Sequence, residues 1–411
     1  MEDVFLAEKK RKLEAAVGGL KKSTLSPKNI ALILDFQGQK CRENLSIHRG
    51  PKYIQHMSQI ARWAGKDLDT FTLEDVQRVV DAIASGGFTD NTMYDYLSVF
   101  SMFGKWLRKT EKNPWGMHIK KPSKGKRRSL PKTEEIYTQE EIKKLISDAG
   151  SIRNSAMFAV LYETAARPGS ELLKLRIKDI EFDKFGARIR IDGKKTETSK
   201  RFVRIVISVP FLSKWLSIHP LRKNGDSYLW ISENRNNGGN VPIRYRQLDK
   251  LFRETVKKCG INRNPNLYCM RKTRITHWYD AGVDAHHIAY MAGHKLNSPE
   301  ILTYANVSAK GPDESILKMH GLKSDEIDVK NNGLQPIVCP ICGEFNENGT
   351  EFCRKCARPL GVKAALEAEK EEQTLKRQLE ELKSFKEKID KMIDEALERK
   401  IGERGLVRNS R

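Results

Sequence analysis

Four side chains that can act together on a phosphodiester occur in order along the chain: Arg167, Arg271, His294 and Tyr304. Each guanidinium can hold two phosphate oxygens in a planar fork. An imidazole can donate a hydrogen bond or move a proton near neutral pH. A tyrosine hydroxyl can be the nucleophile that carries a covalent intermediate. The set therefore predicts chemistry at a phosphorus centre.

The order and spacing of these residues carry more information than any one of them. Arg271 follows Arg167 by about a hundred residues, His294 comes after an Ala-Gly pair, and Tyr304 lies ten residues beyond His294. Taken singly, an arginine or a tyrosine on a helix is usually structural, and a histidine after a glycine can be a helix cap. The presence of all four in this order favours a shared catalytic site instead.

In this order, the stretches around Arg167, Lys195, Arg271, His294 and Tyr304 resemble the tyrosine recombinase (phage-integrase) family. The resemblance covers roughly residues 138–322, and a looser helical likeness extends upstream toward residue 25. Within the family the chain looks most like archaeal integrases, on residues 208–216, on residues 313–321 and on a cysteine-rich tail.

The resemblance implies site-specific cleavage and rejoining of double-stranded DNA by a tetramer on paired sites. In such an enzyme Tyr304 would form a 3′-phosphotyrosyl link. Arg167 and Arg271 would meet the negative charge that grows on the phosphate oxygens. His294 would donate a hydrogen bond to the phosphate or help to deprotonate the tyrosine. No metal is needed for that step.

The resemblance also assigns a lysine at a β-hairpin turn, which protonates the leaving 5′ oxygen. Lys195 matches it, with Lys194 as the alternative. Two positions depart from the family pattern. The family commonly has a histidine three residues before its second arginine, where this chain has Tyr268, a phenol that can still donate to a phosphate oxygen. The family's acid three residues after its first arginine is here Glu171, four residues after.

The composition agrees with a polyanionic partner. The 411 residues carry a formal charge of +22, with 39% hydrophobic residues. Such a charge is unusual for a metabolic enzyme and indicates DNA or RNA, the alternative being a basic, solvated surface. No apolar run is long enough to span a membrane, and the first residues do not form a secretory signal. The chain has seven cysteines, and the three that lie outside the tail show no pattern of disulfide pairing, which favours a reducing cytoplasm.

The N-terminal third predicts an all-α domain. Residues 1–23 indicate a charged helical lead, and residues 24–115 have helical apolar spacing, with a helix-start signal at Thr72–Asp75. Its aromatic residues are expected in the core rather than as base-stacking platforms. The resemblance makes this domain the DNA core-binding domain. Residues 116–135 predict an extended basic linker, whose cations are Lys120, Lys121, Lys124, Lys126, Arg127, Arg128 and Lys132.

Residues 136–325 predict an α+β catalytic domain that is mostly helical. A capping box at Thr138–Glu141 opens it, and helices are expected to about Leu175. Residues 187–192 and 202–208 have β-strand patterns and flank 193–200, which indicates a hairpin. The whole chain is therefore expected to be multidomain and mainly α.

Two Cys-x-x-Cys pairs lie near the C-terminus, Cys339 with Cys342 and Cys353 with Cys356. Four thiolates at this spacing can close a tetrahedral shell around Zn²⁺, which predicts a zinc ribbon over residues 336–360. The four ligands leave no open coordination position, so the zinc would be structural rather than catalytic. A redox pair or unrelated cysteines are the alternative.

Residues 362–400 predict an amphipathic helix. Its heptad seam, interrupted by Lys386, consists of Leu375, Leu379, Leu382, Ile389, Ile393 and Ala396. A two-stranded coiled coil and a single helix packed on a neighbouring domain remain equally open.

Three functions fit these patterns. The leading hypothesis is a site-specific recombinase. A type IB-like DNA relaxing enzyme would use the same active-site logic on one duplex. A DNA-binding protein with impaired catalysis would use the zinc ribbon and terminal helix as its working parts. A covalent protein–DNA adduct separates the enzymes from the binder.

Overall fold

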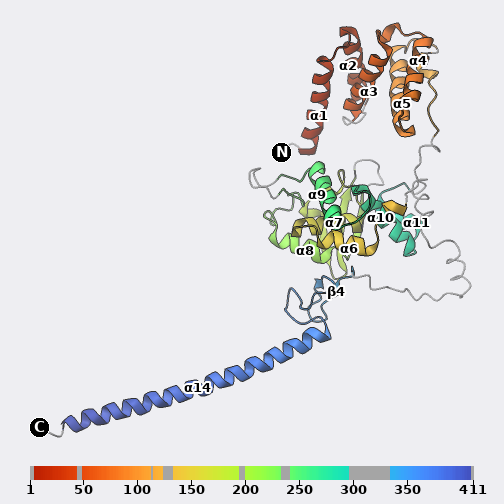
Figure 1. The fold of residues 1–411 in the computed structure, drawn as a ribbon. Coiled ribbons are helices and arrows are strands. Elements are labelled where there is room, and N and C mark those ends of the chain that lie inside the picture. Colours follow the sequence, from red (N-terminus) through yellow and green to blue (C-terminus); the bar gives the residue numbers. More distant parts are fainter. Residues whose placement is uncertain are drawn as a thin grey trace, which may run out of the picture. The chain divides into compact units, whose positions relative to one another are not determined.

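The protein is described here by a computed structural model, which defines residues 4–43, 49–112, 114–123, 133–193, 200–232, 241–295 and 334–408. The chain divides into two compact units, Met1–Leu130 and Pro131–Arg411, which we call the N-terminal and C-terminal units. Helices dominate both, and the described strands form one three-stranded and one two-stranded sheet (Figure 1). The mainly α fold class expected from the sequence is confirmed.

The N-terminal unit is all-α. Its helices are α1 (Val4–Lys21), α2 (Pro27–Arg42), α3 (Gly50–Ala64), α4 (Leu73–Ser85) and α5 (Asp90–Leu107). The helix-start signal is confirmed: the Thr72 hydroxyl accepts from the Asp75 backbone N–H, and the Asp75 carboxylate accepts from that of Thr72. The start of α4 is thus fixed by its own sequence.

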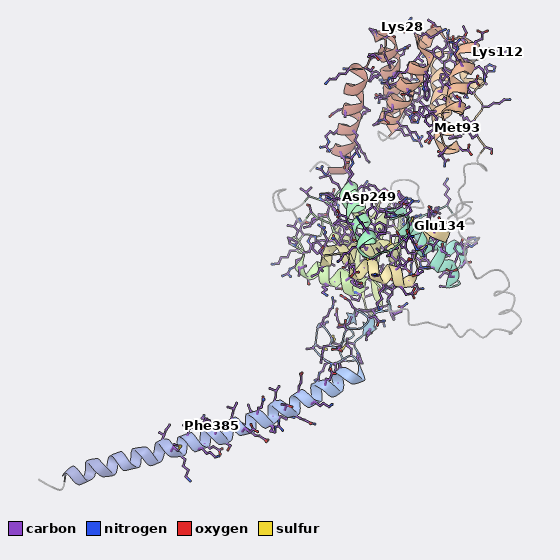
Figure 2. All side chains as sticks on the ribbon, viewed as in Figure 1. Lys28, Met93, Lys112, Glu134, Asp249 and Phe385 are labelled. Atoms are coloured by element: carbon purple, nitrogen blue, oxygen red, sulfur yellow. The ribbon has the colours of Figure 1, made fainter. Side chains whose placement is uncertain are left out.

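Aromatic side chains fill the core of the N-terminal unit, as expected (Figure 2 draws the side chains of both units). Phe36, Phe100 and Phe103 are fully buried, and Trp115 is 5% exposed. The sequence predicted a separate lead over residues 1–23, but Leu20 of α1 lies in this same core, with Leu13, Ala16 and Val17 packed against it. The apolar face of α1 therefore makes the lead part of the packed unit.

The expected linker, 116–135, is shortened at both ends. Ile119 is 6% exposed and belongs to the N-terminal core. At the other end Thr133–Glu135 forms a 3₁₀ turn, and the Glu135 carboxylate pairs with Lys272 at 2.7 Å within the C-terminal unit. Residues 124–132, which include five of the seven basic residues, lie outside the described part of the chain.

The C-terminal unit is organised around one buried helix. Its described elements up to residue 295 are α6 (Gln139–Ser147), α7 (Ile152–Thr164), β1 (Ile180–Asp183), β2 (Gly186–Asp192), β3 (Lys200–Ile205), α8 (Val209–Ile218), α9 (Tyr245–Lys258), α10 (Leu267–Asp280) and α11 (Ala285–Ala292). The capping box Thr138–Glu141 is confirmed at the start of α6. Nearly every residue of α7 is buried, because α6, α8, α10 and β3 all pack against it.

The sheet of this unit has the order β1-β2-β3, with both pairs antiparallel. The predicted hairpin is confirmed as β2 and β3, although β3 ends at Ile205 rather than at 208. Strand β1 was missed because its four residues follow a 3₁₀ turn without a long alternating pattern. Glu163 of α7 anchors the end of β3: its carboxylate accepts the backbone N–H groups of Val206, Ile207 and Ser208 at 2.7–2.9 Å.

The end of the chain contains a two-stranded sheet and one long helix. Strands β4 (Ile337–Val338) and β5 (Phe345–Asn346) pair antiparallel. Helix α14 (Val362–Arg408) contains the expected amphipathic segment and continues beyond residue 400. Among the helices that the structure describes, none is long and apolar enough to cross a membrane.

Candidate active site and cysteine cluster

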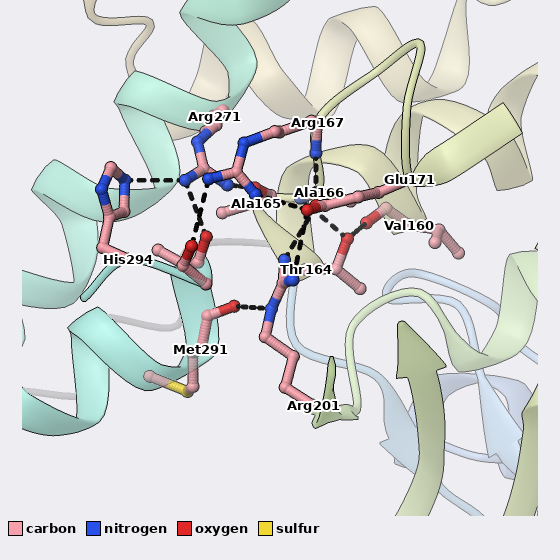
Figure 3. Close-up of polar contacts among 12 residues, drawn as sticks. Val160, Thr164, Ala165, Ala166, Arg167, Glu171, Arg201, Arg271, Met291 and His294 are labelled. Carbon is pink, nitrogen blue, oxygen red and sulfur yellow. Dashed lines mark hydrogen bonds and ion pairs between the residues drawn. The ribbon is translucent and has the colours of Figure 1, made fainter. Parts of the chain in front are cut away.

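Arg271 is the most deeply enclosed of the predicted site residues. It lies on α10 and is 5% exposed. Its guanidinium donates to the carbonyl oxygens of Ala165 and of Ala292, the latter at 2.7 Å, and one of its nitrogens lies 2.7 Å from His294 Nε2 (Figure 3). The end of α7, helix α10 and the end of α11 therefore meet at this side chain.

Arg167 is held by the carboxylate of Glu171. Glu171 accepts a hydrogen bond from the Arg167 backbone N–H at 2.9 Å and pairs with the Arg167 guanidinium. The same guanidinium donates to the carbonyl oxygen of Gly293 at 3.1 Å. The unusual four-residue spacing thus still delivers an acid to this arginine.

Arg201 completes the cluster, although the sequence interpretation did not single it out. Its side chain is 0% exposed, and it donates to Glu171 at 2.9 Å and to the carbonyl oxygen of Met291 at 2.6 Å. Figure 3 shows this guanidinium rising from β3 between Glu171 and the end of α11. We call Arg167, Arg201, Arg271, Glu171 and His294 the arginine cluster.

Two backbone turns shape the cluster. Ala165 has φ +50°, an uncommon value for a residue with a Cβ, and it ends α7 with its carbonyl toward Arg271. Gly293 has φ +65°, and a Cβ there would lie 2.6 Å from an Arg201 nitrogen. A glycine before His294 is therefore required both by the backbone and by the close approach of Arg201.

The environment fixes the ionisation of two members. Burial raises the pKa of Glu171, but the hydrogen bond and charge of Arg201 and the charge of Arg167 outweigh it, so the net pKa is lowered and the group stays ionised. Burial, followed by the nearby guanidiniums, lowers the pKa of His294 to about 3. Since Arg271 donates to His294 Nε2, the ring proton belongs on Nδ1 of a neutral imidazole.

Guanidiniums outnumber carboxylates among the described residues of the cluster. Three guanidiniums meet one carboxylate there, beside a neutral histidine. Fixed cationic donors of this kind can form a preorganised site for an anion. The Arg167 side chain is 17% exposed, so part of the cluster reaches solvent.

Of the other predicted catalytic residues, the structure describes Tyr268. Tyr268 is 44% exposed on the first turn of α10, three residues before Arg271 and hence on the same helix face. Its hydroxyl makes no hydrogen bond to the residues that the structure describes. Lys195, its alternative Lys194 and Tyr304 lie outside the described residues.

A pattern in the sequence could have identified Arg201. Strand β3 alternates exposed and buried positions, and Arg201 occupies the buried phase with Val203 and Ile205. An arginine in the inward phase of an amphipathic strand needs a buried acid, and Glu171 is that partner. The several lysines of the hairpin obscured this signal.

The four predicted cysteines come together in the folded chain. The Sγ atoms of Cys339, Cys342, Cys353 and Cys356 all lie within 4.8 Å of one another. Two pairs are separated by 3.6 and 3.7 Å. A tetrahedral Zn²⁺ with Zn–S bonds of about 2.3 Å places its sulfurs about 3.8 Å apart, so the cluster fits this ion.

Side-chain contacts connect the cysteine cluster to α8. Arg354, between the last two cysteines, pairs with Glu344 and donates to the carbonyl oxygen of Pro210 at 3.0 Å. Lys214 of α8 lies 3.3 Å from the Glu347 carboxylate. Arg354 therefore makes a structural contact between the cysteine segment and α8.

Residues 135–310, which include the arginine cluster, match the phage integrase family, so this part of the chain is similar to that family. Residues 335–361 match a family described as a domain of unknown function (DUF7577).

The curated relatives of this chain include tyrosine recombinases. The chain is 31% identical over 201 residues to tyrosine recombinase XerA of Pyrococcus horikoshii, which covers 46% of this chain and 62% of that protein. It is 24% identical over 249 residues to tyrosine recombinase XerC of Chlamydia pneumoniae, covering 58% and 76%. The match thus spans less than two thirds of the first relative's length.

Solved structures show the same fold. The Tn1549 transposon integrase in complex with circular intermediate DNA has a TM-score of 0.54 at 16% identity, over 71% of this chain and 99% of that one. XerH site-specific recombinase bound to palindromic difH substrate has a TM-score of 0.52 at 16% identity, over 76% and 94%. At these identities the likeness concerns the fold.

Proposed function

We propose that this protein is a site-specific DNA recombinase that cleaves and rejoins double-stranded DNA through a 3′-phosphotyrosyl intermediate. The arginine cluster is the observation that carries the proposal, because it holds two arginines of the predicted set and a third arginine beside a neutral histidine. The names of the relatives, and the DNA bound in the similar structures, support the same substrate.

The charge of the cluster suits the transition state of this reaction. A phosphodiester carries a single negative charge, and more develops on its non-bridging oxygens as Tyr304 attacks. Arg167 and Arg271 present fixed donors whose positions are set by backbone carbonyls and by Glu171. Preorganised donors of this kind stabilise the developing charge without a cost of reorganisation during the reaction.

The two roles open to His294 can now be weighed. A base with a pKa near 3 is a poor acceptor for the proton of a phenol whose reference pKa is about 10. We therefore assign His294 the role of hydrogen-bond donor to the phosphate. Lys195 is proposed to protonate the leaving 5′ oxygen, with Tyr268 as an additional phosphate donor from the exposed face of α10.

We further propose one structural Zn²⁺ in the cysteine cluster and a tetramer on paired DNA sites. The sulfur separations support the metal, whose role would be to hold residues 334–361 folded. The formal charge of +22 supports DNA binding that weakens steeply with salt, since each phosphate contact releases counterions.

A nicked suicide duplex tests the function, with candidate sites taken from repeats that flank the gene. The wild-type chain should form a covalent adduct, and Tyr304→Phe should bind the same duplex without forming one. Tyr96→Phe, in the core of the N-terminal unit, is the matched control and should form the adduct normally. An undiminished adduct with Tyr304→Phe would show that another residue is the nucleophile.

The competing functions give different results in the same assay. A relaxing enzyme would form the adduct and remove supercoils from a plasmid with a single site. A protein with impaired catalysis would bind the duplex and form no adduct in any variant.

A further inference from the structure

The long helix α14 exposes an apolar face along its middle. Six large side chains spaced at helical intervals are 40–65% exposed: Leu375, Leu379, Leu382, Phe385, Ile389 and Ile393. Charged residues occupy the rest of the surface, so the helix is amphipathic along this stretch. Helices in proteins draw most of their stability from packing an apolar face. We therefore expect this stripe to pack against a partner helix.

We propose that α14 pairs in an antiparallel coiled coil with α14 of a second copy of this chain. The seam repeats every three or four residues over the middle of the helix, which is the spacing of a two-helix interface. A pair of identical helices buries both stripes at once. The inference goes beyond recombination and does not depend on it.

Lys386 selects the antiparallel arrangement. This residue interrupts the seam between Leu382 and Ile389. In a parallel pair the two Lys386 side chains would meet in one layer, with their ammonium groups repelling each other. In an antiparallel pair centred between residues 387 and 388, Lys386 lies opposite Ile389 and Leu382 lies opposite Ile393. Each lysine stem can then cover an isoleucine while its charge remains in water.

The edge of the seam favours the same pairing. Phe385 and Met392 are 62% and 69% exposed and lie beside the seam on one flank. About the same centre, Phe385 of each helix approaches Met392 of the other. Contacts between a thioether and an aromatic ring are favourable, and two of them would form by symmetry.

The charges at the two ends of the helix also oppose each other. Residues 366–372 contain four Glu and one Lys, whereas residues 399–408 contain four Arg or Lys and one Glu. Parallel pairing would place like ends together, whereas antiparallel pairing places the acidic end beside the basic end. The two preceding cysteine clusters would then sit at opposite ends of a rod about 70 Å long, given a rise of about 1.5 Å per residue.

Cysteine trapping in the full-length, zinc-loaded protein tests both pairing and direction. Leu382→Cys and Ile393→Cys are prepared as two chains that differ in size, and each is incubated alone and in mixture in a glutathione buffer without DNA. We expect a disulfide-linked dimer in the mixture only, with the unsubstituted chain as background. A dimer of Leu382→Cys with itself would establish parallel pairing, and no dimer above background would mean that these faces do not meet; either result overturns the proposal.

A second measurement uses substitutions on opposite faces of the helix. Leu382→Glu should weaken self-association of the full chain by tenfold or more in sedimentation experiments, because it places charges in the seam. Ser384→Glu, on the opposite face, should leave the association unchanged. Equal association of both variants with the wild type would refute the interface. Since no DNA is present, the result is independent of strand cleavage.

Discussion

The arginine cluster and the cysteine cluster are built in opposite ways. The first collects side chains between Arg167 and His294, from α10, β3 and the ends of α7 and α11. The second takes its four cysteines from the eighteen residues from Cys339 to Cys356. One site therefore depends on the packing of a whole unit, and the other depends on two short turns and on the ion that we propose there.

This difference predicts how far a disturbance should travel. The arginine cluster is a network of buried charges, and removing one partner leaves another uncompensated. The proposed metal ion in the cysteine cluster would couple its binding to the folding of that segment. Damage to the first should spread through the C-terminal unit, while damage to the second should stay local.

The largest effect should come from Arg271→Lys. A lysine cannot bond the carbonyls of Ala165 and Ala292 and a phosphate at the same time, because it lacks the planar fork. We expect single-turnover cleavage to fall by about 10²–10³-fold, the usual cost of removing one such donor, while DNA affinity changes only a few-fold. Arg253→Lys, on the exposed face of α9, serves as the control.

Parallel measurements of binding and cleavage decide the interpretation. If Arg271→Lys lowered affinity and cleavage in proportion, this arginine would be an ordinary phosphate contact. The cluster would then owe its charge to binding rather than to catalysis.

Arg201→Met should disturb stability as much as chemistry. The substitution removes the hydrogen bonds of a fully buried side chain to Glu171 and Met291, while Glu171 keeps Arg167 as an ionic partner, so we expect a loss of about 1–3 kcal/mol. Cleavage should slow because Glu171 no longer holds Arg167 in place. Denaturant unfolding and single-turnover cleavage measure the two effects.

A double variant separates positioning from simple stability. Arg201→Met with Glu171→Gln removes both buried charges, so much of the stability should return. The cleavage rate should remain low, since Arg167 has lost its carboxylate. Full recovery of the rate in the double variant would reduce Arg201 to a structural role.

The same contrast explains what the sequence could predict. Arg167, Arg271 and His294 were found because their order is informative, and the cysteines because their spacing is local. Arg201 was missed because its partner, Glu171, is thirty residues away and only the fold brings them together. The ends of the linker were misplaced for a related reason: Ile119 and Glu135 are fixed by tertiary contacts that no local pattern records.

Cys353→Ser tests whether the cysteine cluster is as local as its geometry indicates. Loss of one thiolate should abolish metal binding and unfold residues 334–361, as measured by metal content and by protease cleavage confined to that segment. The part of the C-terminal unit that precedes this segment should keep its unfolding midpoint and cleave a suicide duplex at about the wild-type rate. The segment contacts α8 through the Glu347 pair with Lys214 and through the Arg354 hydrogen bond to the Pro210 carbonyl, and partly exposed contacts of this kind contribute about 1 kcal/mol or less.

Chelation of the wild-type protein should reproduce this result, and Cys41→Ser, outside the cluster, should change nothing. If the preceding part of the C-terminal unit unfolded together with the cysteine segment, the distinction between the two clusters would be lost.

The smallest effect concerns the pH dependence of stability. The pKa of His294 is about 3 in the folded protein and near 6.5 when unfolded, so the unfolded state binds a proton in this range that the folded state refuses. The destabilising contribution of His294 is absent above pH 6.5, and stability is lost as the pH falls from 6.5 toward 3.

His294→Gln still accepts a hydrogen bond but does not titrate. It should reduce the pH dependence of the unfolding free energy by one proton between pH 6.5 and 5. In this range urea unfolding can be followed before the thiolates of the cysteine cluster are protonated. His277 and His219 are also buried with lowered pKa values, so a residual slope should persist. His286→Gln provides the control on α11, because this imidazole is 72% exposed. An identical slope for wild type and His294→Gln would mean that burial and the guanidiniums do not hold the imidazole neutral, and the assignment of His294 as a neutral hydrogen-bond donor would then be wrong.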